Sequence, residues 1–362
     1  MNNRERIINL VKGEPVDRKP FFLYFGLWGE TAERWKKEGL ALSDEPYAVD
    51  RAFGLDTGIW CAPIDLGYFP AFKEEIVEDR GDTFVMRNHL GILQLVHKHS
   101  AVFPHHLENP VKCREDWIRL RDERLNPDTP GRIPDNIDEW VRNAEKNHAV
   151  IQIGSYPYGL FGTLRDMIGV ENLLYWFYDE PELIAEMMDY LTTFWLSIYE
   201  KALEHMRIDV IHIWEDMSGK SGPLISPAMI REFMAPNYRR IRDFADKHGI
   251  PIMVVDTDGN VTQMIEPFME SGVNMMIPFE VQAGCDVVEY AKKYPDLLIM
   301  GGFDKRVLWD GCGPEDIDRE LERLKPLFAP GVKYCIAPDH LVSPETSLAN
   351  FTYFVEKVKT ML

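Results

Sequence analysis

The sequence predicts an α/β chain that folds as a (β/α)8 barrel of the TIM type. From about residue 150, short β-rich runs alternate with long helical patterns. The runs are continuously apolar, which is typical of parallel strands covered on both faces. The length of 362 residues suits one barrel with an insertion, so we expect a single domain over residues 1–362.

The elements can be placed in chain order. An amphipathic helix opens the chain and ends near Gly13, and the apolar run at residues 21–25 is expected as the first strand. Six further strands are expected at residues 150–154, 208–214, 250–255, 274–278, 297–301 and 332–337. We expect an eighth strand near residues 58–64, and long helices at residues 181–207 and 227–248. An open doubly wound sheet is the alternative, but no G-x-G-x-x-G motif follows any strand.

Residues 72–102 interrupt this rhythm. Apolar and polar residues alternate around turn signals at residues 80–82 and 88–91, which predicts an antiparallel insertion of two or three strands. The segment and its continuation carry five histidines, namely His89, His97, His99, His105 and His106. A metal site here is conceivable because His97 and His99 share a strand face. No carboxylate or cysteine completes a ligand set, so we interpret these histidines as solvated edge and loop residues.

Composition limits the classes of partner. The formal net charge of −19 disfavours nucleic acid, because binding to phosphates depends on clustered Lys and Arg. No apolar run reaches the roughly 20 residues of a membrane helix, and the first 15 residues lack the apolar core of a secretory signal. The five cysteines form no C-x-x-C pair, which fits reduced thiols. We therefore expect a cytoplasmic protein without a membrane or nucleic-acid partner.

Acidic residues follow five successive strands. Catalytic groups of a TIM barrel come from these carboxyl ends, so the pattern predicts an acidic site at one mouth. Such carboxylates repel one another, and their pKa values rise unless a metal or a cationic substrate compensates. The strand-end residues are Glu215 and Asp216, Asp256 and Asp258, Glu280, Asp304, and Asp339 with His340. Each also has a structural interpretation, because Asp258-Gly259 can form a turn and Asp304 can cap a helix.

Four blocks of the sequence resemble the uroporphyrinogen decarboxylase superfamily. They are the Gly-rich loop and helix start at 159–192, the strand and Ser-Pro element at 211–238, the GGFDKRVLWDG stretch at 301–311, and the histidine-containing last loop at 336–351. Their order and spacing are kept over nearly the whole chain. The resemblance implies a TIM barrel.

One departure from the family concerns the substrate. Uroporphyrinogen decarboxylases carry a Met-Arg-Gln-Ala-Gly-Arg-Tyr motif after the first strand, whose arginines bind the substrate's propionates. The corresponding stretch here, residues 23–28 (LYFGLW), has no arginine. An acidic site without guanidinium groups would repel a substrate with eight carboxylates, so decarboxylation of uroporphyrinogen is disfavoured.

The superfamily also contains methyltransferases that exchange methyl groups with a corrinoid protein. In the zinc-dependent thiol-methylating members, a His-x-Cys follows the strand equivalent to residues 250–255, and a cysteine lies in the final loop. Here Asp256, Asp258 and His340 take these positions. Oxygen ligands and one imidazole could hold zinc or another divalent ion but suit thiol activation poorly. The resemblance is closer to O- and N-demethylating enzymes, in which a metal or an acid polarises the leaving heteroatom.

Our first hypothesis is therefore a methyltransferase that acts with a corrinoid protein on a small methylated donor. In it Asp256, Asp258 and His340 bind a metal or the substrate, and Glu215 and Glu280 act as acid or further ligand, so that Glu215, Asp258, Glu280 and His340 form the catalytic set. Asp216 and Asp304 are expected to contact the substrate, and aromatic residues are expected to line the pocket: Tyr24, Phe25, Trp28, Tyr68, Phe69, Tyr156 and Tyr158.

Two alternatives remain open at this point. The first is a decarboxylase of another substrate, with His340 or Asp258 as proton donor. The second is a non-catalytic binding subunit, since a fold alone does not imply function. For the assembly, a homodimer is the arrangement that we consider.

Overall fold

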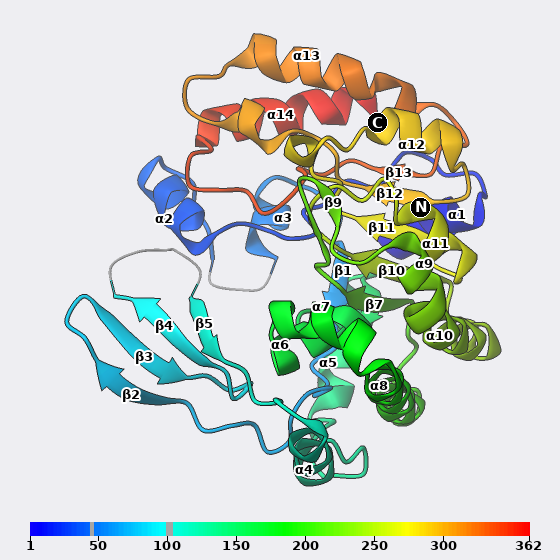
Figure 1. Cartoon of the computed structure of the whole chain (residues 1–362). Coiled ribbons are helices and arrows are strands. Elements are labelled where there is room, and N and C mark those ends of the chain that lie inside the picture. The colour runs from blue at the N-terminus through cyan, green and yellow to red at the C-terminus, as the bar shows by residue number, and fades with distance from the viewer. Residues whose placement is uncertain (44–46, 99–103) are drawn as a thin grey trace.

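The computed structural model describes residues 1–43, 47–98 and 104–362. At its centre lies a sheet of seven parallel strands that curls around an inner face, in the order β1-β6-β7-β10-β11-β12-β13 (Figure 1). These strands are β1 (Ile59–Cys61), β6 (Val150–Ile153), β7 (Val210–Trp214), β10 (Ile252–Asp256), β11 (Met275–Ile277), β12 (Leu298–Met300) and β13 (Tyr334–Cys335). Sequential strands are neighbours throughout, as in a TIM barrel, and the predicted α/β class is confirmed.

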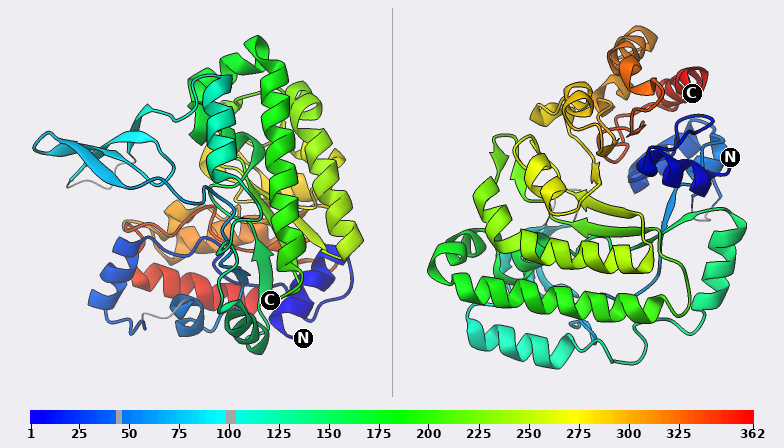
Figure 2. Two further views of the ribbon diagram at one scale, coloured as in Figure 1. Left: turned by 90° about the horizontal axis from the view of Figure 1, so that it is seen from below. Right: turned by 90° about the vertical axis from the view of Figure 1, so that its right-hand side faces the viewer.

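Helices surround this sheet (Figure 2). In chain order they are α2 (Gly29–Lys37), α3 (Ala48–Ala52), α4 (Arg114–Arg124), α5 (Ile137–Lys146), α6 (Leu160–Ile168), α7 (Val170–Asp179), α8 (Pro181–Ala202), α9 (Pro227–Met229), a π-helical turn at Ile230–Met234, α10 (Ala235–His248), α11 (Ile265–Glu270), α12 (Val287–Lys293), α13 (Pro314–Leu324) and α14 (Leu348–Met361). Single turns of 3-10 helix lie at Val281–Ala283, Lys305–Leu308 and Lys325–Phe328. The long helices expected at 181–207 and 227–248 correspond to α8 and to the run from α9 to α10. Helix α4 lies outside α8, which it contacts through Trp117 and Tyr190 (Figure 2).

The first predicted strand is the exception. Residues 21–25 form no ladder, and Phe21 makes one isolated parallel bridge to Ile336, next to β13. Their backbone donors are taken by side chains, because the N–H of Phe21 donates to Asp56 at 2.8 Å and that of Leu23 donates to Asp50 at 3.2 Å. The prediction of a regular strand here was wrong for this reason. The eighth strand expected near residues 58–64 exists as β1.

The insertion forms a separate antiparallel sheet of four strands that projects from the body (Figures 1 and 2). Its strands are β2 (Glu75–Asp79), β3 (Thr83–Arg87), β4 (Leu93–His97) and β5 (His105–Glu108). The two predicted turns lie between β2 and β3 and between β3 and β4. The insertion is longer than predicted, because β5 begins beyond residue 102. His99 lies outside the described residues.

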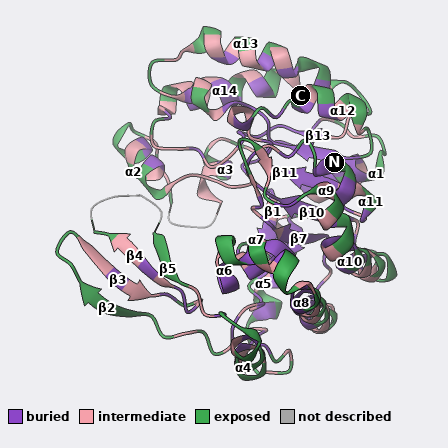
Figure 3. Ribbon diagram, in the orientation of Figure 1, coloured by how far each residue is buried: buried purple, intermediate pink, exposed green. Residues whose placement is uncertain are grey.

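Two apolar clusters follow from the alternation of side chains along the strands. Ile211, Met253 and their equivalents point outward and pack against the helices. Val210, Ile252 and their equivalents point inward, where they meet helix α1 (Asn3–Lys12), which covers the inner face of the curled sheet at the end where the strands begin. Figure 3 shows the buried strands at the centre of the body. Helix α1 therefore occupies the inner face where the strands begin, and a site is expected at their carboxyl ends.

No helix within the described ranges combines the length and apolar character needed to traverse a lipid bilayer.

Candidate active site

Two acids and a histidine predicted for the site meet at the carboxyl ends of the strands. His340 follows β13, and its Nε2 lies 3.4 Å from Oδ2 of Asp258, which follows β10. The imidazole stacks on the ring of Phe25, with centroids 5.3 Å apart and planes inclined by only 5°. Burial disfavours the imidazolium, but the hydrogen bond and charge of Asp258 outweigh it and raise the pKa of His340. The pair therefore favours a protonated histidine held in a fixed plane.

Glu280 and a lysine complete this group. Glu280 follows β11; its Oε2 accepts a hydrogen bond from the N–H of Gly259 at 3.0 Å, and its Oε1 lies 3.6 Å from Nζ of Lys305. We call Asp258, Glu280, Lys305 and His340 the rim cluster. Their side chains are between 19% and 37% exposed, so a ligand can reach all four. Lys305 was not among the predicted site residues, although it follows the predicted strand-end acid Asp304 directly.

Asp339 supports the rim cluster from below. It is fully buried, with Oδ2 accepting from the N–H of Val281 at 2.8 Å and Oδ1 accepting from the N–H of Lys305 at 3.1 Å. Burial raises the pKa of Asp339 to about 6. This carboxyl group joins the loops that follow β11, β12 and β13, and so sets the spacing of Glu280, Lys305 and His340.

Asp256 lies deeper, on the inner face of the sheet. Its carboxylate is 6% exposed and lies 3.3 Å from Nε2 of His212, which is 4% exposed. Burial is the main cause that raises the pKa of Asp256. Nδ1 of His212 contacts the amide of Gln152, whose oxygen accepts a hydrogen bond from the hydroxyl of Tyr24 at 2.6 Å.

His212 and Gln152 were missed by the sequence reasoning. A signal was present, because each is the one polar residue in a buried apolar run, at a position that alternates with inward-facing Val210 and Val150.

Glu215 is used within the fold. Its carboxylate is fully buried and accepts hydrogen bonds from the N–H groups of Leu160, Phe161 and Gly162 at the start of α6, and from the hydroxyl of Tyr238. A carboxylate at a helix N-terminus satisfies free donors and interacts favourably with the helix dipole. Burial raises the pKa of Glu215 to about 7 in spite of these bonds.

Asp304 likewise caps the 3-10 turn that begins at Lys305. It accepts from the N–H of Arg306 at 3.0 Å and forms an ion pair with that residue's guanidinium at 3.0 Å. The cap considered for this residue in the sequence is thus present.

The remaining predicted contacts form a second group around Arg165. Asp216 pairs with this guanidinium at 2.6 Å, and Arg165 also lies over the ring of Trp214. Tyr156, which is 58% exposed, packs edge-on against Trp214. The backbone N–H of Trp28 donates to the carbonyl oxygen of Val342, in the loop that carries His340.

The expected metal site does not fit this arrangement. Asp258 is paired with His340, whereas Asp256 is paired with His212, so the three expected ligands do not converge. Across residues 1–43, 47–98 and 104–362, no three His, Cys, Asp or Glu side chains are grouped as metal ligands. That statement includes the described histidines of the insertion. We therefore derive no step through a metal ion.

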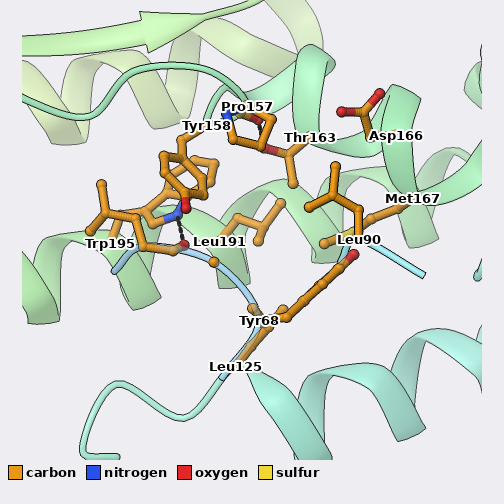
Figure 4. Close-up of a pocket in the computed structure, with 12 residues that line it drawn as sticks. Tyr68, Leu90, Leu125, Pro157, Tyr158, Thr163, Asp166, Met167, Leu191 and Trp195 are labelled. Carbon is orange, nitrogen blue, oxygen red and sulfur yellow. Dashed lines mark hydrogen bonds between the residues drawn. The ribbon is translucent and has the colours of Figure 1, made fainter. Parts of the chain in front are cut away.

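A small apolar cavity is lined mainly by residues after β1 and β6 and by α6 and α8 (Figure 4). Tyr68, Tyr158 and Trp195 form much of its wall, and Asp166 lies at its edge next to Thr163. Its volume is about 30 Å³, enough for roughly two water molecules. Tyr68 and Tyr158, expected at a substrate pocket, thus line a space too small for an organic substrate.

Comparisons with known proteins bear on this geometry. No curated protein matches the chain. Among solved structures, a methyltransferase from Methanosarcina mazei superposes with a TM-score of 0.66 at 17% identity, over 99% of each chain. This similarity supports the barrel-like fold. The family model for uroporphyrinogen decarboxylase (URO-D) matches residues 95–361, which is well over half of the sequence. The chain therefore belongs to the uroporphyrinogen decarboxylase family.

Proposed function

We propose that this protein is a methyltransferase that moves a methyl group from a small O- or N-methyl donor to a corrinoid cofactor or corrinoid protein. The observation that carries the proposal is the ion pair of His340 and Asp258 at the open mouth, stacked on Phe25. It provides a cationic acid beside a partly exposed space, which is what a poor oxygen or nitrogen leaving group requires. The methyltransferase among the solved structures, which spans the same length, gives further support.

The reaction assigns roles to His340 and Asp258 of the rim cluster and to Phe25. A reduced corrinoid, when bound, supplies the electron pair that forms the new bond to the methyl carbon. The bond from this carbon to its heteroatom breaks, and the heteroatom keeps the electron pair. Because Nε2 of His340 is engaged by Asp258, we assign proton donation to its Nδ1–H, so that the donor leaves as an alcohol or amine. Asp258 stabilises the imidazolium before transfer, and Phe25 fixes the ring plane.

The charges of the mouth disfavour a polyanionic substrate. The rim cluster has two carboxylates against one lysine and one histidine, and Asp256 and Asp339 add acids beneath it. Arg165 is committed to Asp216 and to Trp214. A substrate with many carboxylates would find no free guanidinium pair in residues 23–28, where the decarboxylases have theirs. A neutral or cationic methyl donor suits this mouth better.

The test mixes the purified chain with cob(I)alamin or a reduced corrinoid carrier and a panel of methoxylated compounds and methylated amines. Formation of methylcobalamin, followed by the cobalt absorption spectrum, is the expected result for at least one donor. His340→Gln should reduce the rate by about 10²- to 10⁴-fold, as loss of a general acid does. The control is His205→Gln, which changes an exposed histidine on the outer face that pairs with Asp138.

Two outcomes would contradict the proposal. Failure of every donor with both corrinoid acceptors is the first. Release of CO2 from a carboxylic substrate without a corrinoid is the second, and would favour the decarboxylase. Elemental analysis of the fresh protein is a further check, because a stoichiometric metal lost in Asp258→Asn would replace the acid role with metal binding.

A further inference from the structure

A chain of polar contacts crosses the inner face of the sheet below the rim cluster. The hydroxyl of Tyr24 donates to Oε1 of Gln152 at 2.6 Å, and Nε2 of Gln152 lies 3.2 Å from Nδ1 of His212. Nε2 of His212 in turn lies 3.3 Å from Oδ2 of Asp256. These residues come from the segment before α2 and from the neighbouring strands β6, β7 and β10. This row of contacts therefore connects Tyr24 to the buried acid Asp256.

A backbone carbonyl oxygen determines which atoms donate and which accept in this row of contacts. Nε2 of Gln152 also lies 2.8 Å from the carbonyl oxygen of Gly154. A carbonyl oxygen can only accept, so the amide nitrogen of Gln152 must face it and the amide oxygen must face Tyr24. The reversed amide would place two acceptors against each other. Both N–H groups of Gln152 are thereby assigned, one to Gly154 and the other to His212.

Gly154 is suited to this task by its lack of a side chain. Its φ is +83°, and a Cβ at this position would lie 2.3 Å from the backbone oxygen of His212. Only glycine allows β6 and β7 to approach so closely here. This approach brings the amide of Gln152 within reach of the imidazole of His212.

The orientation of the Gln152 amide also determines the tautomer of His212. Because the amide of Gln152 donates to Nδ1, this nitrogen carries the lone pair and the proton sits on Nε2. Nε2–H is buried and lies 3.3 Å from Oδ2 of Asp256, so this carboxyl group is the acceptor within its reach.

We infer that Gln152 and His212 are positioning residues: they hold a neutral imidazole with its proton on Nε2, directed at the carboxyl group of Asp256. This inference rests on the proposed function for its expected effect on methyl transfer, but the tautomer follows from the contacts alone. Neither residue needs to touch the methyl donor. The hydroxyl of Tyr24 and the carbonyl oxygen of Gly154 hold the side-chain amide of Gln152 in place.

The first test is independent of any reaction. The full chain, labelled with ¹⁵N-histidine, is examined by NMR at one neutral pH, and the signal of His212 is identified by its loss in His212→Gln. We expect the neutral tautomer with hydrogen on Nε2. In Gln152→Glu a carboxylate replaces the donating amide and accepts from Nδ1, so the ring should carry hydrogen on Nδ1. Gln263→Glu, at an exposed position, makes the same charge change and should leave the signal of His212 unaltered.

The second test uses methyl-transfer kinetics. His212→Gln keeps an amide nitrogen near the position of Nε2, so it should retain kcat within about 10-fold of wild type. His212→Asn keeps a polar group near Nδ1 but withdraws the donor from Asp256, and should lower kcat by about 10- to 100-fold, the value of one hydrogen bond to a charged group. A role limited to packing would not separate these two variants in this order.

The outcomes distinguish this inference from the proposed function. If the wild-type chain transfers no methyl group but His212 shows hydrogen on Nε2, the proposed function fails and the positioning geometry stands. If methyl transfer occurs but His212 is protonated on Nδ1, or Gln152→Glu leaves its tautomer unchanged, the inference is overturned. Equal kcat values for His212→Gln and His212→Asn would overturn it as well.

Discussion

Replacing Asp166 with asparagine removes a carboxyl group that is expensive to ionise. Asp166 lies in α6 at the edge of the cavity in Figure 4, is 7% exposed, and has no hydrogen bond to Oδ2 from any described residue. Burial raises its pKa from 3.8 to about 6; the charge of Arg165 opposes this rise, and that of Asp216 adds to it. The folded state therefore binds this proton more tightly than the unfolded state does.

The size and sign of the effect follow from these values. A rise from 3.8 to about 6 corresponds to about 3 kcal/mol, at about 1.4 kcal/mol for each pKa unit. Because the pKa of Asp166 is higher in the folded state, tighter binding of its proton stabilises the fold. This stabilisation is complete below pH 3.8 and is lost as the pH rises through 6. Asparagine cannot ionise, so the Asp166→Asn variant loses no stability from ionisation at this position over this pH range. The variant should thus gain up to about 3 kcal/mol over wild type at pH 8, and about half of that at pH 5.

Urea denaturation of the two proteins at both pH values measures this difference. Any cost of burying the amide itself does not depend on pH, so the change between pH 5 and pH 8 isolates the carboxyl group. Asp179→Asn, at an exposed position at the end of α7, should change stability by less than about 0.5 kcal/mol at either pH. A stability difference for Asp166→Asn that is the same at pH 5 and pH 8 would refute the reasoning.

Three further predictions concern the site and its support. In Asp258→Asn, the carboxylate that raises the pKa of His340 is lost, so the alkaline limb of the kcat profile should move to lower pH; an unmoved limb would contradict His340 as the acid. In Glu215→Ala, the buried donors at the start of α6 lose their acceptor, which should cost about 3–5 kcal/mol in urea denaturation; a loss under about 1 kcal/mol would argue against the capping role. In Gly159→Ala, the new Cβ would lie 1.7 Å from the carbonyl oxygen of Trp214, so the folded yield should fall sharply, whereas Gly29→Ala, with no atom within 4 Å, should fold normally.

Much of the fold was predictable because the strands are apolar and the helices long. Alternation of these two patterns placed six strands from residue 150 onward to within two residues or so at most ends. The segment at residues 21–25 has the same composition but not the same structure. Its backbone donors bind the carboxylates of Asp50 and Asp56, and no local pattern reveals that two distant acids will replace a neighbouring strand.

The site was predictable only in part, because position after a strand does not determine what a carboxylate binds. Asp258, Glu280 and His340 meet as the strand-end rule predicts. Glu215 and Asp304 follow strands in the same way, but their oxygens face free N–H groups at the start of a helical turn. Telling these cases apart requires knowing which helix begins beside each loop, and this depends on how the layers pack.

The face of the sheet to which a strand residue points identifies site residues that the position of a residue at a strand end does not. In a curled parallel sheet the outer face must be apolar to pack against helices, and α1 closes the inner face at the end where the strands begin. A polar side chain that points inward can then meet only other inward side chains or whatever enters the mouth. Gln152, His212 and Asp256 satisfy this condition on three adjacent strands, and the face to which each points can be read from the inward valines at 150, 210 and 254. Burying three polar groups together is costly unless they form a connected network. The inner polar positions of neighbouring strands therefore identify candidate site residues more selectively than the acids of the loops, and the tautomer of His212 tests that criterion directly.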